Sequence, residues 1–173
     1  MSYVNSPTLS VLFTGLSAWI QSTLGLAQAF VVQELQNLAA MPNGPFACMT
    51  HKTQKRLGEM VSTFSPSLGQ ETYQQDLDFT IQLDLYGPAS GDWAAVVIAL
   101  WRSEMTVNFL AAYGLTPLWA DDPIEMSLVD GEEQFEERWI VMLHLNYQPS
   151  VTAAQDSMSA AKVAIINVET LPR

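Results

Sequence analysis

Strict alternation of apolar and polar side chains over residues 76–86 constrains the fold more than any other part of this sequence. The apolar positions are Leu77, Phe79, Ile81, Leu83 and Leu85, and the polar positions are Asp76, Asp78, Thr80, Gln82 and Asp84. Because successive side chains of a β-strand point to opposite faces, this pattern predicts a strand. One face should be buried, and the other should be wet or shared with a partner.

Further strands are predicted on both sides of this one. Phe46–Arg56 has strand character, and Asp130-Gly131 predicts a hairpin turn between residues 124–129 and a strand that starts near Gln134. This last strand is partly apolar on both faces, which is typical of a central strand or of one that touches a second subunit.

The remaining segments between strands are weaker in pattern. Residues 58–69 contain Ser65-Pro66 and are predicted to form a loop, residues 118–120 a short strand, and residues 163–168 a last β-prone run. The chain from Pro149 to Met158 is polar and small, and no strand is expected there.

The first predicted helix begins with Ser6 as N-cap and Pro7 in the first turn, runs to about Thr23, and stops at Gly25. Its apolar residues recur at helical spacing with Ser, Thr and Gln on the other side, so it is amphipathic and not membrane-spanning. Residues 27–40 fit either a short strand or a second helical turn.

A second predicted helix follows the turn at residues 87–91, with Ser90 or Asp92 as its cap. It continues to Tyr113, with a break near Thr106, and Gly114 closes it. The resulting order of helix, strands, helix, strands predicts an α+β fold with a mostly antiparallel sheet and helices packed on one face. We expect one domain over residues 1–173.

Composition favours a protein that covers part of its surface with partners. Of the 173 residues 49% are hydrophobic and only 14% charged, whereas about a quarter is typical of soluble domains. An ordinary surface of uncharged polar residues is the alternative. The formal net charge of −11 argues against a protein that grips nucleic acid, because phosphate binding depends on Lys and Arg.

No motif for nucleotide binding, zinc hydrolysis or a nucleophilic serine occurs in the chain. Cys48 is alone, lies in an apolar strand and is expected to be buried; it permits no internal disulfide and suits a reducing compartment. His51 and His144 are expected to be ordinary strand residues. We therefore expect no catalytic residue, no cofactor and no metal site.

Charge is distributed unevenly. The chain's one basic cluster is Lys52, Lys55 and Arg56, and Trp119 is the best candidate for an apolar interface anchor. Acidic residues crowd the predicted hairpin: Asp121, Asp122, Glu125, Asp130, Glu132, Glu133, Glu136 and Glu137. They form a solvated face, a contact surface for the basic cluster of an identical copy, or a catalytic or cation site. We expect the second, with Asp121, Asp122, Glu132, Glu133, Glu136 and Glu137 as contact residues.

Three stretches carry a family resemblance: residues 92–104, residues 109–118, and the string Gly131-Glu132-Glu133-Gln134-Phe135-Glu136-Glu137-Arg138-Trp139 that leads into a strand. In these the chain resembles the neck and tail-terminator proteins of tailed bacteriophages. The Glu-Glu-Arg-Trp string after a glycine turn is the most specific of the three. Together the resemblance covers roughly residues 79–152.

The resemblance implies a structural virion protein at the head–tail junction, assembled in the host cytoplasm. It implies α/β subunits in a ring, usually sixfold, that caps the tail tube around the DNA channel. The implied partners are further copies of the chain, the tail tube and possibly the sheath, and the head-completion proteins. Double-stranded DNA would pass without specific binding, and no membrane is involved. A head-completion or other tail subunit is the alternative, and a small acidic enzyme or metal-binding domain is an alternative of another class.

Overall fold

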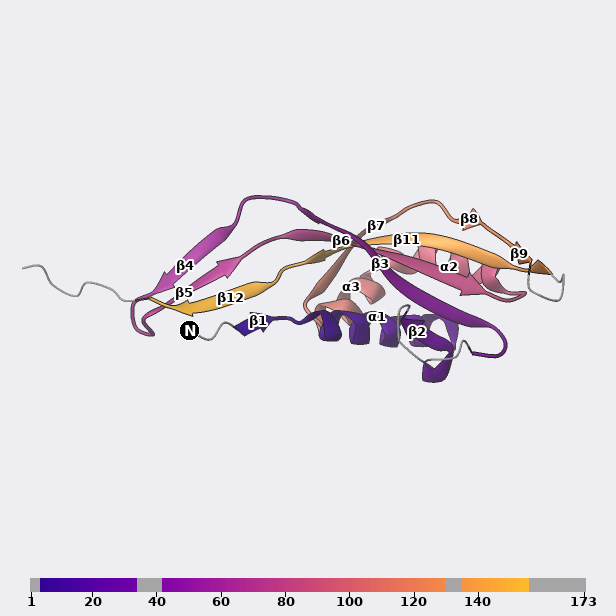
Figure 1. The fold of residues 1–173 in the computed structure, drawn as a ribbon, viewed down its shortest axis with the longest axis horizontal. Coiled ribbons are helices and arrows are strands. Elements are labelled where there is room, and N and C mark those ends of the chain that lie inside the picture. The colour runs from indigo at the N-terminus through magenta and orange to yellow at the C-terminus, as the bar shows by residue number, and fades with distance from the viewer. Residues whose placement is uncertain (1–3, 34–41, 130–134, 156–173) are drawn as a thin grey trace, which may run out of the picture.

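Two larger sheets, one two-stranded sheet and one layer of helices make up the part of the protein that the structure describes (Figure 1). The computed structural model describes residues 4–33, 42–129 and 135–155. The larger sheet has the order β2-β3-β6-β11-β7, with β8 on the β7 side of β11. Its strands are β2 (Val31–Gln33), β3 (Phe46–Arg56), β6 (Leu77–Tyr86), β7 (Leu115–Ala120), β8 (Ile124–Glu125) and β11 (Arg138–Tyr147). All neighbours are antiparallel except β2 and β3.

The helices lie on one face of this sheet, as Figure 1 shows. They are α1 (Leu9–Leu24), α2 (Ser90–Trp101) and α3 (Glu104–Ala111), and a 3-10 turn, η1 (Gln28–Phe30), leads from α1 to β2. One core forms between the two layers, because the apolar side of β6 packs with Leu16 and Trp19 of α1 and with Trp101 of α2. This confirms the predicted α+β fold.

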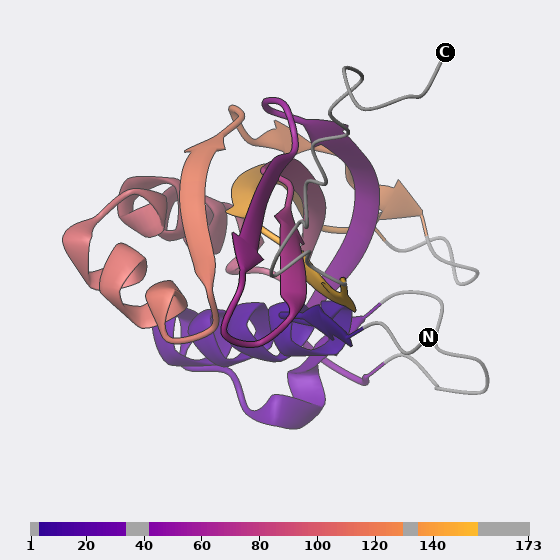
Figure 2. The same cartoon turned by 90° about the vertical axis from the view of Figure 1, so that its left-hand side faces the viewer.

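A second sheet continues three of these strands beyond the helices and is called the wing here. It has the order β1-β12-β5-β4, all antiparallel. Its strands are β1 (Val4–Ser6), β4 (Val61–Ser65), β5 (Gln70–Gln74) and β12 (Ser150–Ala154). Seen along the long axis, the strands form an arc over α1 (Figure 2).

The strongest strand predictions are confirmed. β3 spans the predicted residues, β6 begins one position later than the alternation, and β11 pairs with β6 on one side and with β7 and β8 on the other. It is therefore the central strand that its two apolar faces indicate. β9 (Leu128–Val129) pairs antiparallel with β10 (Phe135–Glu136), and the predicted turn at Asp130-Gly131 lies outside the described residues.

The polar face of β6 is not wet. Asp78, Thr80 and Asp84 are all buried within the single chain. Larger side chains on the neighbouring strands cover them: Arg138 bonds Asp84, and His144 bonds Asp78. The period-two pattern was therefore correct for the strand, and its expectation for the second face was wrong.

The predicted loop at residues 58–69 is also wrong in part. It contains β4, and the turn after β4 leads into β5. Ser150–Ala154 forms β12, where no strand was expected, and residues 118–120 belong to the longer β7. The run at residues 163–168 lies outside the described residues.

The helices begin at other residues than the sequence predicts. Thr8, not Ser6, caps α1, since its Oγ1 accepts from the Val11 amide while Ser6 belongs to β1. The N-cap of α2 is Ala89, so neither Ser90 nor Asp92 caps it. The break before α3 falls at Ser103 instead of Thr106, whereas Gly25 does close α1 in the left-handed conformation.

Within the described residues, no single helix is long and apolar enough to cross a membrane. α2 and α3 meet that length and composition only when taken together, with a bend of 79° between them.

Candidate contact surfaces

One lateral edge of the larger sheet is basic. β2 pairs only with Ala47–Met49, so the second half of β3 has no strand on its outer side among the described residues. Lys52, Lys55 and Arg56 all lie on this half and are exposed. None of them forms an ion pair within the part of the chain that the structure describes. The predicted basic cluster is thus open to a partner.

The opposite lateral edge is acidic. Asp121 and Asp122 follow β7, Glu125 ends β8, and all three side chains are exposed. Asp121 Oδ2 lies 3.7 Å from Nε2 of His144. Because the strand order runs from β3 through β6 and β11 to β7, the basic and acidic residues line opposite sides of one sheet.

The remaining predicted acidic contacts do not join this edge. Glu132 and Glu133 lie outside the described residues. Glu136 is exposed on β10, which pairs with β9, and β9 lies at the end of the molecule away from the wing (Figure 1). Glu137 is half-buried, and its carboxylate accepts a 3.1 Å bond from Trp139 Nε1. The structure therefore divides the acidic residues between two places.

Arg138 of the Glu-Glu-Arg-Trp string joins the start of β11 to β6. Arg138 donates to Asp84 Oδ1 from Nε at 3.0 Å and from Nη2 at 2.6 Å. Its guanidinium also lies 5.5 Å from the ring centre of Tyr86. Burial raises the pKa of the Tyr86 phenol above its ordinary value of 10.0, and the positive charge of Arg138 partly opposes this rise.

An apolar patch lies on the sheet face that the helices leave open. It consists of exposed Trp119, Ile124 and Met126, at 41%, 58% and 52% exposure, and is called the outer-face patch. The half-buried Ile140 and Met142 of β11 lie beside it. Large apolar side chains grouped in this way mark interaction sites.

Trp119 is held in a fixed position within this patch. Its ring stacks on His144 at 4.3 Å, and His144 Nδ1 is bonded to Asp78 at 3.0 Å. Thr80 Oγ1 lies 3.3 Å from the same nitrogen. An aromatic side chain that is already oriented loses little conformational freedom on binding, which suits the predicted role of an interface anchor.

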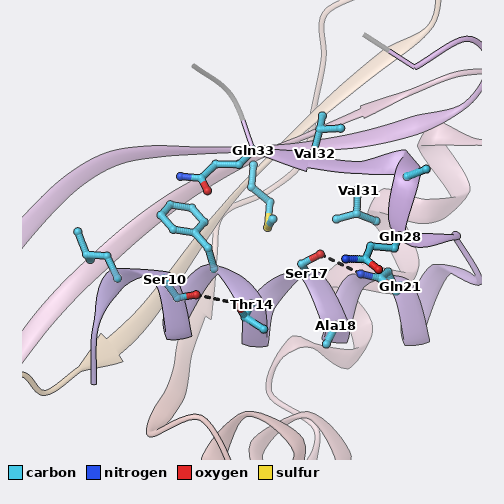
Figure 3. Close-up of a pocket in the computed structure, with 13 residues that line it drawn as sticks. Ser10, Thr14, Ser17, Ala18, Gln21, Gln28, Val31, Val32 and Gln33 are labelled. Atoms are coloured by element: carbon cyan, nitrogen blue, oxygen red, sulfur yellow. Dashed lines mark hydrogen bonds between the residues drawn. The ribbon is translucent and has the colours of Figure 1, made fainter. Parts of the chain in front are cut away.

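A groove of about 880 Å³ runs between α1 and β2 (Figure 3). Ser10, Thr14, Ser17 and Gln21 face it from α1, and their side chains are bonded along the helix, Thr14 to the Ser10 carbonyl and Gln21 to Ser17. The lining contains only apolar, hydroxyl and amide side chains, so it offers no group for acid–base chemistry near neutral pH.

The residues considered for chemistry are not brought together. His51 stacks on Phe79 of the core, whereas His144 lies on the other face of the sheet. Cys48 is buried, as predicted. Among the described residues, no three His, Cys, Asp or Glu side chains are grouped so that they could hold a metal ion.

Some exposed residues were not anticipated from sequence. Ile124 and Met126 belong to the outer-face patch, and Val61 and Phe64 are exposed in the wing. Apolar residues usually signal a core, so only the tertiary structure distinguishes these from buried ones. The scarcity of charge around residues 60–70 was the one available signal.

The described part is thus an α+β subunit with two oppositely charged edges and an exposed apolar patch, which are features of a protein that assembles with partners. A family model described as "Phage neck terminator protein" matches residues 10–170. The chain therefore belongs to the phage neck terminator family, a family of structural proteins, and is a component of the phage neck. No curated protein matches it.

Proposed function

We propose that copies of this chain join head to tail into a closed ring, a hexamer, that caps the tail tube and joins it to the head-completion proteins. The observation that carries the proposal is the basic edge along β3 and the acidic edge along β7 and β8 of the same sheet. When the same contact repeats from copy to copy, the basic edge of each copy meets the acidic edge of the next. If the rotation between neighbouring copies divides a full turn evenly, the copies close into a ring.

Charge complementarity would set the direction of assembly more than its strength. Lys52, Lys55 and Arg56 of one copy meet Asp121 and Asp122 of the next, while pairs of like edges repel. Such a contact also removes the three exposed cations from the DNA channel. The net charge of −11 then repels the genome as it passes, without phosphate contacts that would slow it. A channel lined by these cations would contradict this part of the proposal.

The partners follow from this position. The tail tube, and the sheath of a contractile tail, would meet one side of the ring, and the head-completion proteins the other. The outer-face patch suits such a contact because it presents Trp119 already oriented. The protein performs no catalysis in this role, needs no cofactor and binds no membrane, and assembly takes place in the host cytoplasm.

Charge reversal tests the head-to-tail contact. One variant carries Lys52→Glu, Lys55→Glu and Arg56→Glu, and a second carries Asp121→Lys and Asp122→Lys. Each alone has two edges of like charge and should not assemble. A mixture of the two, or one chain with all five changes, restores unlike edges and should assemble again. Light scattering after size exclusion, on the free chain and on isolated tails, measures the assembled mass.

Arg102→Glu serves as the matched control, since Arg102 is exposed between α2 and α3 and lies on neither edge. It should assemble as the unchanged chain does. Failure of the mixture to assemble would contradict the edge contact. Particles made by phage that lack the protein distinguish tail termination from head completion. Overlong tails without heads indicate termination, whereas filled heads without tails indicate head completion.

A further inference from the structure

The wing has no core of its own. Between Leu57 and Asp76, and in β12, no residue is buried, and the helices cover only the larger sheet (Figure 1). Val61 and Phe64 of β4 are 58% and 37% exposed, and Leu68 at the turn is 69% exposed. Most residues of β5 and β12 are half-buried, and a small sheet without buried side chains is marginal in water, so a partner is expected to cover the wing.

Both edges of the wing are open and unprotected in the described part of the chain. β4 and β1 each pair with one strand only, and neither contains a charged residue or a proline. Natural sheets usually guard free edges with Lys, Pro or a bulge. The edges of the larger sheet are guarded in this way, β7 by Pro117 and the outer half of β3 by Lys52 and Lys55.

The strand directions allow the two open edges to meet. The order β1-β12-β5-β4 is antiparallel throughout, so β1 and β4 run in opposite directions. When one copy is rotated onto the next, β4 of the first and β1 of the second are antiparallel neighbours. Neighbouring strands then run in opposite directions all the way around a ring.

We propose that β4 of each copy pairs with β1 of the next copy, so that the wings close into one continuous antiparallel barrel. This inference rests on the proposed ring and names the backbone contact that joins its subunits. β1 is only three residues long. The ladder is therefore short, and the exposed apolar side chains of β4 contribute the rest of the contact.

The charged edges independently point to the same joint. β4 continues β3, and β12 continues β11, so β4 lies on the side of the basic edge. β1 lies on the side of β7 and the acidic edge, because Tyr147, opposite Leu115 of β7, bonds the Pro7 carbonyl just after β1. Joining β4 to the next β1 thus brings unlike charges together in the same step.

Cysteine pairs test the joint on the full-length chain, free and in virions. In a Cys48→Ala background, one cysteine replaces Val4, Asn5 or Ser6 and another replaces Ser62, Thr63 or Phe64, so that all registers are sampled. Oxidation of at least one double variant should give a ladder of covalent multimers, while each single variant stays uncrosslinked. A dimer from Ser62→Cys alone would indicate β4–β4 pairing and overturn the proposal.

Lysine on the open edge gives a second readout. Ser62→Lys with Thr63→Lys should weaken self-association about tenfold or more, since charge on an edge opposes pairing. Gln70→Lys, exposed on the inner strand β5, is the matched control and should leave self-association unchanged. Circular dichroism checks that each variant is folded.

The outcomes separate the two proposals. Rings that persist in the lysine variant and give no crosslink in any double variant would overturn the edge pairing and leave the ring intact. Loss of binding to isolated tails with self-association unchanged would assign the wing to the tail tube and overturn the inference as well. Absence of any ring, free or in virions, would overturn the proposed function itself.

Discussion

Gly15 illustrates how single residues decide packing in this protein. It is buried in α1, where a Cβ would lie 2.6 Å from Cγ of Tyr113. A glycine inside a helix normally costs about 1 kcal/mol relative to alanine. Here it permits α1 to approach the segment after α3, so the requirement comes from a contact between distant parts of the chain.

Gly15→Ala is therefore expected to destabilise the fold by about 1 kcal/mol, because an overpacking cost of about 1–3 kcal/mol exceeds the gain in helix propensity. Urea unfolding of the free chain measures this. With Tyr113→Ala as the background the clash is gone, and the same change should stabilise. A change of equal sign in both backgrounds would contradict the packing explanation.

At the scale of elements, the start of each helix depends on one side chain or on none. Ser103 caps α3, since its Oγ accepts from the Thr106 amide at 3.3 Å. Ser90, which sequence suggested as a cap of α2, lies one residue inside the helix, and its Oγ is buried without a partner among the described residues. The same residue type thus has opposite effects at the two helix starts.

Ser103→Ala should lower the free energy of unfolding by about 1 kcal/mol through loss of the cap. Ser90→Ala should leave it unchanged or raise it, because an unpaired buried hydroxyl is removed. Thermal and urea unfolding of the two variants, side by side, measure the difference. Equal destabilisation by both would mean that Ser90 does cap α2.

At the scale of the whole molecule, charge and backbone pairing make separable contributions to assembly. The charged edges involve exposed side chains, whose attraction salt screens. The wing edges contain no charged residue, so their pairing should respond little to salt. The proposed ring contact therefore has one salt-sensitive part and one insensitive part.

Self-association should weaken when salt rises from about 0.05 to about 0.5 M, since the Debye length falls to a few ångströms. In a chain with Lys52→Gln, Lys55→Gln and Arg56→Gln, association should be weaker at low salt and nearly independent of salt. Analytical ultracentrifugation of each chain at the two salt concentrations measures the strength of association and its dependence on salt. An equal salt dependence in the two chains would mean that the basic edge takes no part in the contact.

The sequence by itself determined the elements whose pattern is local. The alternation along β6, the two apolar faces of β11 and the Gly25 stop of α1 each depend on neighbours within a few residues, and each was confirmed. The antiparallel α+β class followed from their order. The single domain over residues 1–173 stays a prediction.

Only the tertiary structure decided which side chains lie together. Asp84 is buried because Arg138 reaches it from the neighbouring strand, and β4 is exposed because its sheet extends past the helices. The acidic residues that were predicted to form one contact surface lie in two places, because neighbouring strands position them. Asp121 lies on a lateral edge of the larger sheet, whereas Glu137 is bonded to Trp139. Register and layer boundaries join residues far apart in the chain, and such long-range contacts leave no periodic signal in the sequence.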